Sequence, residues 1–155
     1  FMKNLPVQRK LNRVMSEINH NNTISIHVRR QDYVHLQHVH VLQDNNYYKK
    51  AIDILTKKIS KDYKLVIFSD DITWCKNNKI FTNHNCYFVE GNKDYVDLYL
   101  MSMCTHHIIA NSSFSWWGAY LNEIEGRLVV APEKWFGPKG PKTWNTIYCS
   151  DWLIV

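Results

Sequence analysis

The sequence predicts an α/β fold, a Rossmann-like parallel sheet with helices on both of its faces. Short apolar segments alternate along the chain with helical segments of roughly 10–15 residues, which is typical of βαβ units. Polar clusters also follow directly after four of the expected strands, at residues 27–30, 69–71, 90–91 and 111–113. Right-handed crossovers bring those strand ends to one edge of a sheet. The 155 residues contain no internal repeat, so we expect a single domain over residues 1–155.

The expected elements follow from periodicity and from polar stop signals. Strands are predicted where apolar runs end at polar or turn residues, at 23–28, 64–68, 86–89, 107–110 and 128–131. Helices are predicted at 7–19, 46–59, 93–103 and from the residue after Ser113 to Leu121, with a further short helix ending near Asn78. Residues 33–46 show no clear period and are expected to form a loop. The remainder, rich in Gly, Pro and Trp, is expected to be an irregular tail.

Composition narrows the class of protein. The chain is 45% hydrophobic and 14% aromatic, which is typical of a globular core. The net charge of +5 suits a phosphate-bearing ligand, but the basic residues are scattered and no nucleic-acid partner is expected. No apolar run approaches the ~20 residues of a membrane span. The four cysteines are widely spaced and are expected to be free thiols.

The cluster His27-Val28-Arg29-Arg30-Gln31-Asp32 follows the first expected strand. Ligands of open α/β sheets bind at the carboxyl ends of the strands. Two guanidinium groups there indicate an anionic ligand, most plausibly a phosphate, because arginine is always charged and offers a planar fork of donors. The alternative is a surface salt bridge between Asp32 and one of the arginines.

Two other clusters follow later strands and precede helices. Asn111-Ser112-Ser113 either caps its helix or leaves backbone N–H groups and hydroxyls open to an anion. Ser69-Asp70-Asp71 is expected to combine a helix cap with a carboxylate partner for Arg29 or Arg30.

Three further features carry weaker signals. Asp97 lies among apolar neighbours, and its spacing alone favours the solvent-facing side of a helix. The histidines at 35, 38 and 40 lack fixed helical spacing and a nearby carboxylate or cysteine, so no metal site is predicted. Trp116-Trp117 is expected to pack in the core, with a ring edge lining a sugar pocket as the alternative.

Several of these segments, in order and spacing, resemble the α-1,2-fucosyltransferase family. They are His27 to Tyr33, Phe68 to Asp71, Asp97 to Ser102, Ala110 to Gly118 and Pro132 to Phe136. The resemblance implies the C-terminal, nucleotide-sugar-binding half of a GT-B-type glycosyltransferase. It further implies transfer of L-fucose from GDP-fucose to a galactoside hydroxyl with inversion, with no cofactor and no essential metal.

The resemblance also assigns roles to residues. Arg29 is implied to bind the donor β-phosphate and to neutralise charge on departing GDP, while His27 and Arg30 contact the nucleotide. Asp97 is implied to pair with the guanine edge, against the solvent-facing position favoured by its spacing. Ser112 and Ser113 are implied to bind phosphate, and Asn111 beside them is included in the substrate site. Asp71 is included in the substrate site as a partner of the arginines. Asp32 is the nearest candidate for the general base, although orienting Arg29 or Arg30 is the favoured role.

Two departures from the family pattern stand out. Gln31 occupies a position where the family usually has glycine, and a side chain there is expected to crowd the turn. The chain is also about half the length the resemblance implies, and much of the acceptor site is expected in an N-terminal half. The alternative function is therefore a non-catalytic nucleotide-sugar- or glycan-binding domain. A cytoplasmic bacterial location is expected, with peripheral membrane association left open.

Overall fold

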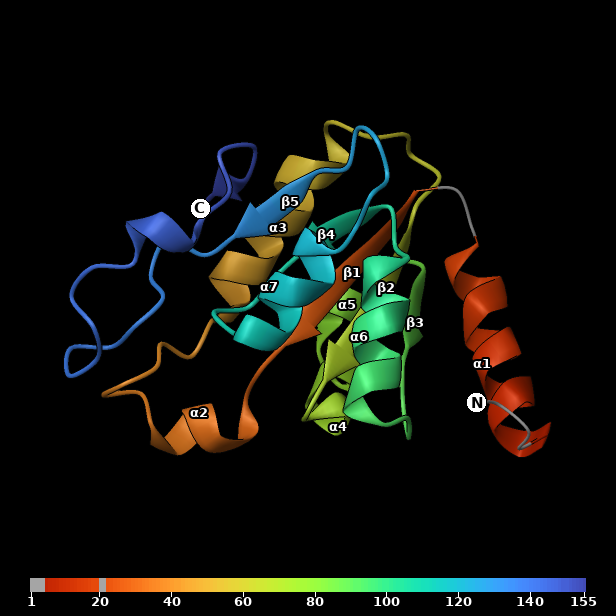
Figure 1. Ribbon diagram of the computed structural model, residues 1–155, viewed down its shortest axis with the longest axis horizontal. Coiled ribbons are helices and arrows are strands. Elements are labelled where there is room, and N and C mark those ends of the chain that lie inside the picture. The colour runs from red at the N-terminus through yellow and green to blue at the C-terminus, as the bar shows by residue number, and fades with distance from the viewer. Residues whose placement is uncertain (1–4, 20–21) are drawn as a thin grey trace.

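The computed structural model describes residues 5–19 and 22–155, which form a sheet of six parallel strands flanked by helices (Figure 1). The strands are β1 (Thr23–Val28), β2 (Lys64–Ser69), β3 (Cys86–Phe88), β4 (His106–Ile108), β5 (Val129–Ala131) and β6 (Leu153–Ile154). Their order across the sheet is β3-β2-β1-β4-β5-β6. This is the strand order of the dinucleotide-binding Rossmann fold, so the predicted fold class is confirmed.

Helices cover both faces of the sheet because successive strand residues point to opposite sides. The helices are α1 (Leu5–Ile18), α2 (Gln31–His35), α3 (Asn45–Thr56), α4 (Ile72–Lys76), α5 (Lys79–Thr82), α6 (Asp94–Ser102) and α7 (Ser113–Tyr120). Ile24 and Ile67 are buried in a core with residues of α3, α4 and α5. Phe68, which follows Ile67, is buried on the other face with residues of α1 and α6.

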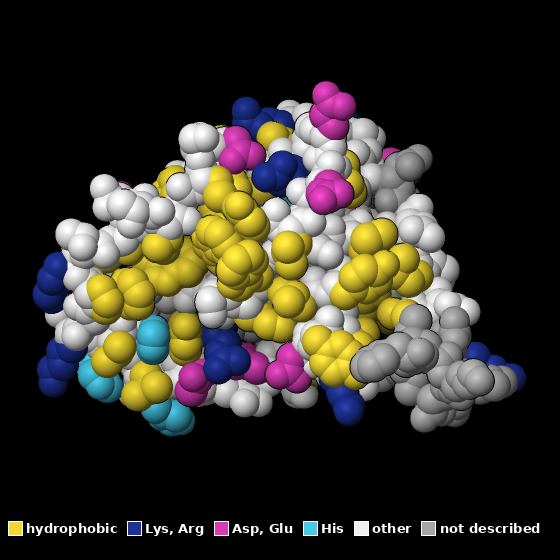
Figure 2. All heavy atoms as spheres, viewed as in Figure 1, with side chains coloured by type: hydrophobic (Ala, Val, Ile, Leu, Met, Phe, Trp, Pro, Cys, Tyr) yellow, Lys and Arg dark blue, Asp and Glu magenta, His cyan; other side chains and the backbone are white. Residues whose placement is uncertain are grey.

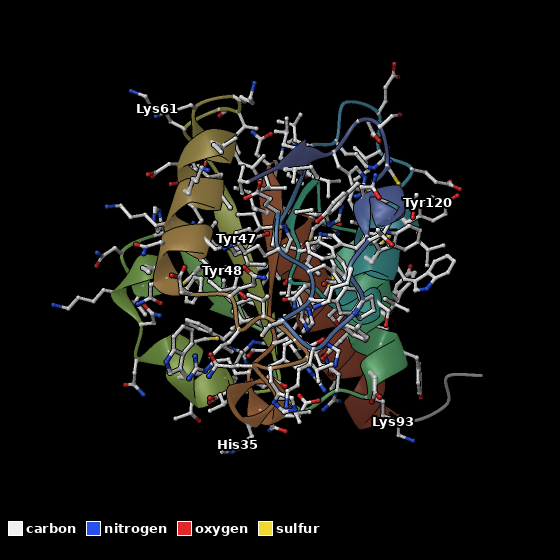
Figure 3. All side chains as sticks on the ribbon, turned by 90° about the vertical axis from the view of Figure 1, so that its left-hand side faces the viewer. His35, Tyr47, Tyr48, Lys61, Lys93 and Tyr120 are labelled. Atoms are coloured by element: carbon white, nitrogen blue, oxygen red, sulfur yellow. The ribbon has the colours of Figure 1, made fainter. Side chains whose placement is uncertain are left out.

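Two tyrosines of α3 hold the two central strands together at their carboxyl ends. Tyr47 and Tyr48 point from α3 into the sheet (Figure 3). The hydroxyl of Tyr48 donates to the carbonyl of His27 over 3.2 Å, and that of Tyr47 donates to the carbonyl of Ile109 over 2.5 Å. Burial is the main cause that raises the pKa of both phenols, so both remain donors. The helix thus fixes the ends of β1 and β4, from which the predicted site residues emerge.

The loop predicted over residues 33–46 was partly wrong, because the short helix α2 occupies its beginning. Helix α2 is a single turn that starts directly after β1, and five residues are too few to show a helical period. The backbone N–H of Leu36 donates to the carbonyl of Asp32 at its end. A second short helix, α5, was likewise missed after the predicted end near Asn78.

The C-terminal tail is more regular than its composition suggested. It contains a 3₁₀ turn at Asn145–Ile147 and the edge strand β6, which pairs with β5. A two-residue strand is too short to show an alternating pattern, which explains why the sequence did not reveal it.

The prediction that Trp116 and Trp117 both pack in the core was wrong for Trp117, which is 48% exposed on α7. Figure 2 shows the apolar surface that this face presents over α6 and α7.

A buried polar network joins β1, β4 and the end of α7, on the face of the sheet to which His27 also points. Nδ1 of His107 lies 2.7 Å from the hydroxyl of Ser25, and its Nε2 lies 2.7 Å from the amide nitrogen of Asn122. The Asn122 amide nitrogen also donates to the carbonyl of Cys104, and its oxygen accepts from the N–H of Ile124. The amide orientation therefore makes Nε2 of His107 an acceptor and Nδ1–H the donor. His107 is thus a neutral structural residue.

We expect the domain to lose stability as the pH falls below about 6.5. Burial lowers the pKa of His107 to about 3, and burial with the charge of Arg29 does the same for His27. Below the unfolded pKa the unfolded chain binds protons that the folded chain does not, so the unfolding free energy falls by about 1.4 kcal/mol per pH unit for each histidine. Urea denaturation between pH 7 and pH 5 measures this slope. A His107→Gln variant with an unchanged slope would show that His107 does not contribute.

Two further sequence expectations concern the cysteines and the membrane. All four cysteines are free thiols, and Cys75 and Cys104 are buried. Over residues 5–19 and 22–155, no helix has both the length and the apolar character that crossing a bilayer requires.

Candidate functional site

Three of the nine predicted site residues, His27, Arg29 and Asp97, line one pocket at the carboxyl ends of the strands, and the other six do not. The pocket lies next to the point where the strand order reverses, between β1 and β4. In open α/β sheets the crevice at such a switch point is the usual ligand site. The volume of the pocket is about 270 Å³. It is lined by His27, Arg29, Phe68, Ser69, Asp70, Asn92, Asp94, Asp97 and Phe114. We call it the switch-point pocket.

Arg29 is held at the rim of this pocket by two carboxylates. One terminal nitrogen of its guanidinium lies 2.9 Å from Asp32, and its Nε lies 3.3 Å from Asp70. The guanidinium also lies over the ring of Tyr33, 5.6 Å from its centre. Its side chain remains 36% exposed, so the charge is oriented by its neighbours yet open to a ligand.

Arg30 turns away from the pocket. Its Nε lies 3.3 Å from Asp71, and its guanidinium stacks 4.0 Å from the ring centre of Trp74. Asp71 also accepts from the backbone N–H of Trp74 and so caps α4. The expectation that Asp70 and Asp71 combine a cap with partners for the two arginines is confirmed. The structure does not bring Arg30 and Asp71 to the lining of the pocket.

His27 lines the pocket with a nitrogen that has no partner. Its side chain is 5% exposed, and among the described residues no hydrogen-bond partner reaches its Nδ1. The ring lies 5.3 Å from that of Phe114. Burial, followed by the charge of Arg29, lowers the pKa of His27 to about 3. The imidazole is therefore neutral and able to exchange a hydrogen bond with a bound molecule.

Asp97 lies in the pocket, at the first turn of α6. Asn92, in the loop before this helix, donates its amide N–H to Asp97 over 2.8 Å. The solvent-facing position favoured by spacing was therefore wrong, since spacing within one helix does not report what packs beside it.

The Asn111-Ser112-Ser113 cluster divides into two parts. Ser112 is the N-cap residue of α7, but no side-chain hydrogen bond from it caps the helix in the described structure. Ser112 and the exposed Ser113 therefore stand at a helix N-terminus with hydroxyls available to an anion. Asn111 is 1% exposed and points into the protein. Its amide N–H groups donate to the carbonyls of Val41 and Trp135, so the structure does not bring it to the pocket.

Gln31 does not crowd the turn as expected. Its side chain is exposed, and its amide N–H donates to the carbonyl of Asp70 over 2.6 Å. The contact ties the first turn of α2 to the end of β2, where Asp70 faces Arg29. Gln31 thus adds a link between the two strand ends.

Sequence reasoning missed six of the nine lining residues, namely Phe68, Ser69, Asp70, Asn92, Asp94 and Phe114. Asp70 was detectable, because it follows a strand and precedes a capping aspartate. Asn92 gave no signal, and Phe114 lay in a segment of the family resemblance without a role of its own, since only the packing of α6 and α7 against the strand ends brings both side chains to the pocket. Among the described residues, no group of three or more His, Cys, Asp or Glu side chains could hold a metal ion.

Comparison with known proteins identifies the family. The model of Glycosyl transferase family 11 matches residues 4–155. The chain belongs to this family. The family resemblance inferred from the sequence is thereby confirmed, and the match covers nearly the whole chain.

Sequence similarity to three named proteins supports this membership. The O-antigen biosynthesis glycosyltransferase WbnK of Escherichia coli is 41% identical over 122 residues, 74% of this chain and 39% of that protein. An alpha-1,2-colitosyltransferase of Escherichia coli is 43% identical over 121 residues, 74% and 41% of the two chains. Galactoside alpha-(1,2)-fucosyltransferase 2 of Rattus norvegicus is 32% identical over 107 residues, 63% and 29% of the two chains. The chain thus spans less than half the length of each of these three relatives.

A solved structure supports the fold. NodZ alpha-1,6-fucosyltransferase, co-crystallized with GDP, matches 76% of this chain and 42% of its own, with a TM-score of 0.50 and 16% sequence identity. At this identity the likeness shows the fold alone, and it agrees with the predicted half of a GT-B-type glycosyltransferase.

Proposed function

We propose that the chain is the donor-binding part of an inverting α-1,2-fucosyltransferase and that the switch-point pocket holds GDP-fucose. The observation that carries this proposal is the placement of Arg29. Its guanidinium is oriented by Asp32 and Asp70 at the mouth of a pocket beside the N-terminus of α7. A fixed cation and open helix N–H groups on one edge suit a diphosphate.

In the proposed reaction, the bond between C1 of fucose and the β-phosphate oxygen breaks, and its electron pair stays on GDP. The acceptor hydroxyl oxygen bonds to C1 from the opposite face, and its proton passes to a base. Arg29 stabilises the charge that develops on the departing phosphate, with no metal required in this scheme. Preorganised donors of this kind contribute about 2.7–4 kcal/mol to a transition state.

Asp97 and His27 are proposed to hold the nucleoside side of the donor. The Asp97 carboxylate accepts hydrogen bonds, and the guanine edge offers donor N–H groups. The neutral imidazole of His27 has an Nδ1 without a hydrogen-bond partner among the described residues, so this atom is able to bond to the nucleoside. Both side chains line the same pocket as Arg29, which supports one continuous nucleotide site.

Asp32 is proposed to orient Arg29 rather than to act as the general base. Burial raises the pKa of Asp32, but the hydrogen bond from Arg29 and the charge of Arg29 together outweigh it, so the pKa lies below its usual value. A carboxylate with a lowered pKa is a weak base near neutral pH. In this proposal the base comes from outside the residues assigned here.

The acceptor is proposed to be a galactose-containing glycan, as the name of the rat relative suggests. A bacterial cytoplasmic setting is proposed for the reaction, and the organism of the two Escherichia coli relatives supports its bacterial part. The colitosyltransferase relative makes colitose the second candidate for the transferred sugar. The same pocket would serve a non-catalytic domain, and a transfer assay with GDP-fucose and N-acetyllactosamine distinguishes that alternative, because turnover would exclude it.

Calorimetric titration with GDP tests the phosphate site. We expect Ser112→Ala to weaken GDP binding about tenfold, because one hydrogen bond to a charged phosphate is lost. We expect the free energy of unfolding to change by less than about 0.5 kcal/mol, since the hydroxyl caps nothing. Ser102→Ala, on α6, is the matched control and should leave GDP binding unchanged. A stability loss in Ser112→Ala without a loss of GDP affinity would favour the capping role instead.

A further inference from the structure

A second depression lies at the carboxyl edge of the sheet, between residues 36–43 and 132–144. We call it the tail groove. Its volume is about 590 Å³, within the range of small-molecule sites. The groove has apolar walls, formed by Phe136, Pro138 and Trp144. It is also lined by polar side chains, those of Gln37, Glu133 and Lys134.

The two walls of the tail groove are fastened backbone to backbone. The N–H of Gly137 donates to the carbonyl of Val39 over 2.8 Å, and that of Lys139 donates to the carbonyl of His38 over 2.7 Å. A Cβ on Gly137 would collide with the backbone of Gln37 and His38. Glycine is therefore required for this close approach, and the groove has a fixed shape.

Asn111 anchors both walls of the tail groove from the end of β4. Its amide N–H groups reach the carbonyl of Val41 over 2.9 Å and that of Trp135 over 2.7 Å. Gln43 donates to the Asn111 side-chain oxygen and to the carbonyl of Lys134. The residue predicted to bind substrate thus shapes the groove that lies along the same sheet edge.

A continuous row of side chains joins the tail groove to the switch-point pocket. Arg29 lies over the ring of Tyr33, Tyr33 stacks on His40 with ring centres 4.6 Å apart, and His40 lies 6.1 Å from Phe136. Arg29 lines the pocket, and Phe136 lines the groove. Figure 3 looks onto this side of the molecule, with His35 at the end of α2.

We propose that the tail groove binds the sugar acceptor, a neutral oligosaccharide that presents a galactoside. This inference rests on the proposed function, which requires an acceptor that reaches the donor along this edge of the sheet. A galactose ring has one apolar face of C–H groups, which suits Phe136 and Trp144, and an edge of hydroxyls, which suits an amide, a carboxylate and an ammonium group. Two lysines, Lys134 and Lys142, and one carboxylate, Glu133, also line the groove. Titration with inorganic phosphate therefore distinguishes a neutral saccharide from an anionic ligand.

The indole N–H of Trp144 provides an NMR signal that reports saccharide binding in the tail groove. Its indole N–H donates to the carbonyl of Glu133 over 2.9 Å and gives its own NMR signal, which a Trp144→Phe variant identifies. On titration of the chain with N-acetyllactosamine we expect a saturable shift of this signal. The signal of Trp117, exposed on α7, is the control and should stay in place.

Two variants test the same groove. Trp144→Ala should weaken saccharide binding about tenfold. Gln37→Ala, an exposed position, should weaken it as well and guards against misfolding of the tryptophan variant.

Several outcomes separate this inference from the proposed function. No shift at Trp144, an equal shift at Trp117, or the same shift on titration with inorganic phosphate would overturn the acceptor groove. If GDP binds in a parallel calorimetric titration while the saccharide leaves Trp144 unmoved, the groove fails and the donor site stands. If Trp144 responds saturably while GDP does not bind, the saccharide site stands and the proposed donor site fails.

Discussion

Replacing Arg29 by alanine is expected to weaken GDP binding roughly 100-fold, because charge-assisted hydrogen bonds to the phosphate are lost. The guanidinium is already oriented by Asp32 and Asp70, so little ordering is required when the phosphate arrives. The fold should remain intact, since a side chain that is 36% exposed contributes about 1 kcal/mol or less through its ion pairs. Calorimetric titration of the folded variant with GDP measures the effect.

Two further variants sharpen this result. Arg29→Lys keeps the charge but loses the planar fork, and we expect an intermediate loss of roughly tenfold. Arg127→Ala removes an arginine that pairs with Asp151 at the far end of β5, and it should leave GDP affinity unchanged. Equal GDP affinity in Arg29→Ala and the unsubstituted chain would refute the phosphate role.

Replacing Asn111 by alanine is expected to lower the free energy of unfolding by about 3 kcal/mol. The substitution removes two donated hydrogen bonds and one accepted from Gln43, and it leaves the carbonyls of Val41 and Trp135 without their partner. Unsatisfied buried groups are costly because water cannot reach them. Urea denaturation monitored by tryptophan fluorescence measures the change.

Asn77→Ala is the matched control for this variant. The amide of Asn77 also donates to a carbonyl, that of Thr73, but the side chain is exposed and water replaces the bond. Its expected loss is below about 0.5 kcal/mol. If both variants lost the same stability, Asn111 would not be the anchor of the two segments.

The sequence was sufficient for the sheet and for its functional edge, because both depend on local patterns. Apolar runs of β1 and β2 end at charged residues, and parallel topology alone places those residues together. The same reasoning could not separate Arg29 from Arg30. The difference arises from Trp74, which packs beside Arg30 from a helix more than forty positions later and draws it out of the pocket.

Long-range packing also explains the misassigned residues. Asn111 looks like a residue for anions or caps, yet the segments that receive its hydrogen bonds lie 70 and 24 positions away in the sequence. Asp97 was placed in solvent by spacing and in the pocket by the resemblance, and the structure supports the resemblance. The tail groove had no sequence signal, because it forms only where two irregular segments meet.

The most direct test of the central claim is a crystal structure of the chain with GDP. We expect the β-phosphate within hydrogen-bond distance of the Arg29 guanidinium and of Ser112, with the guanine edge at Asp97. GDP bound in the tail groove, or at the switch-point pocket without a phosphate contact to Arg29, would contradict the assignment of this sheet edge as the donor site.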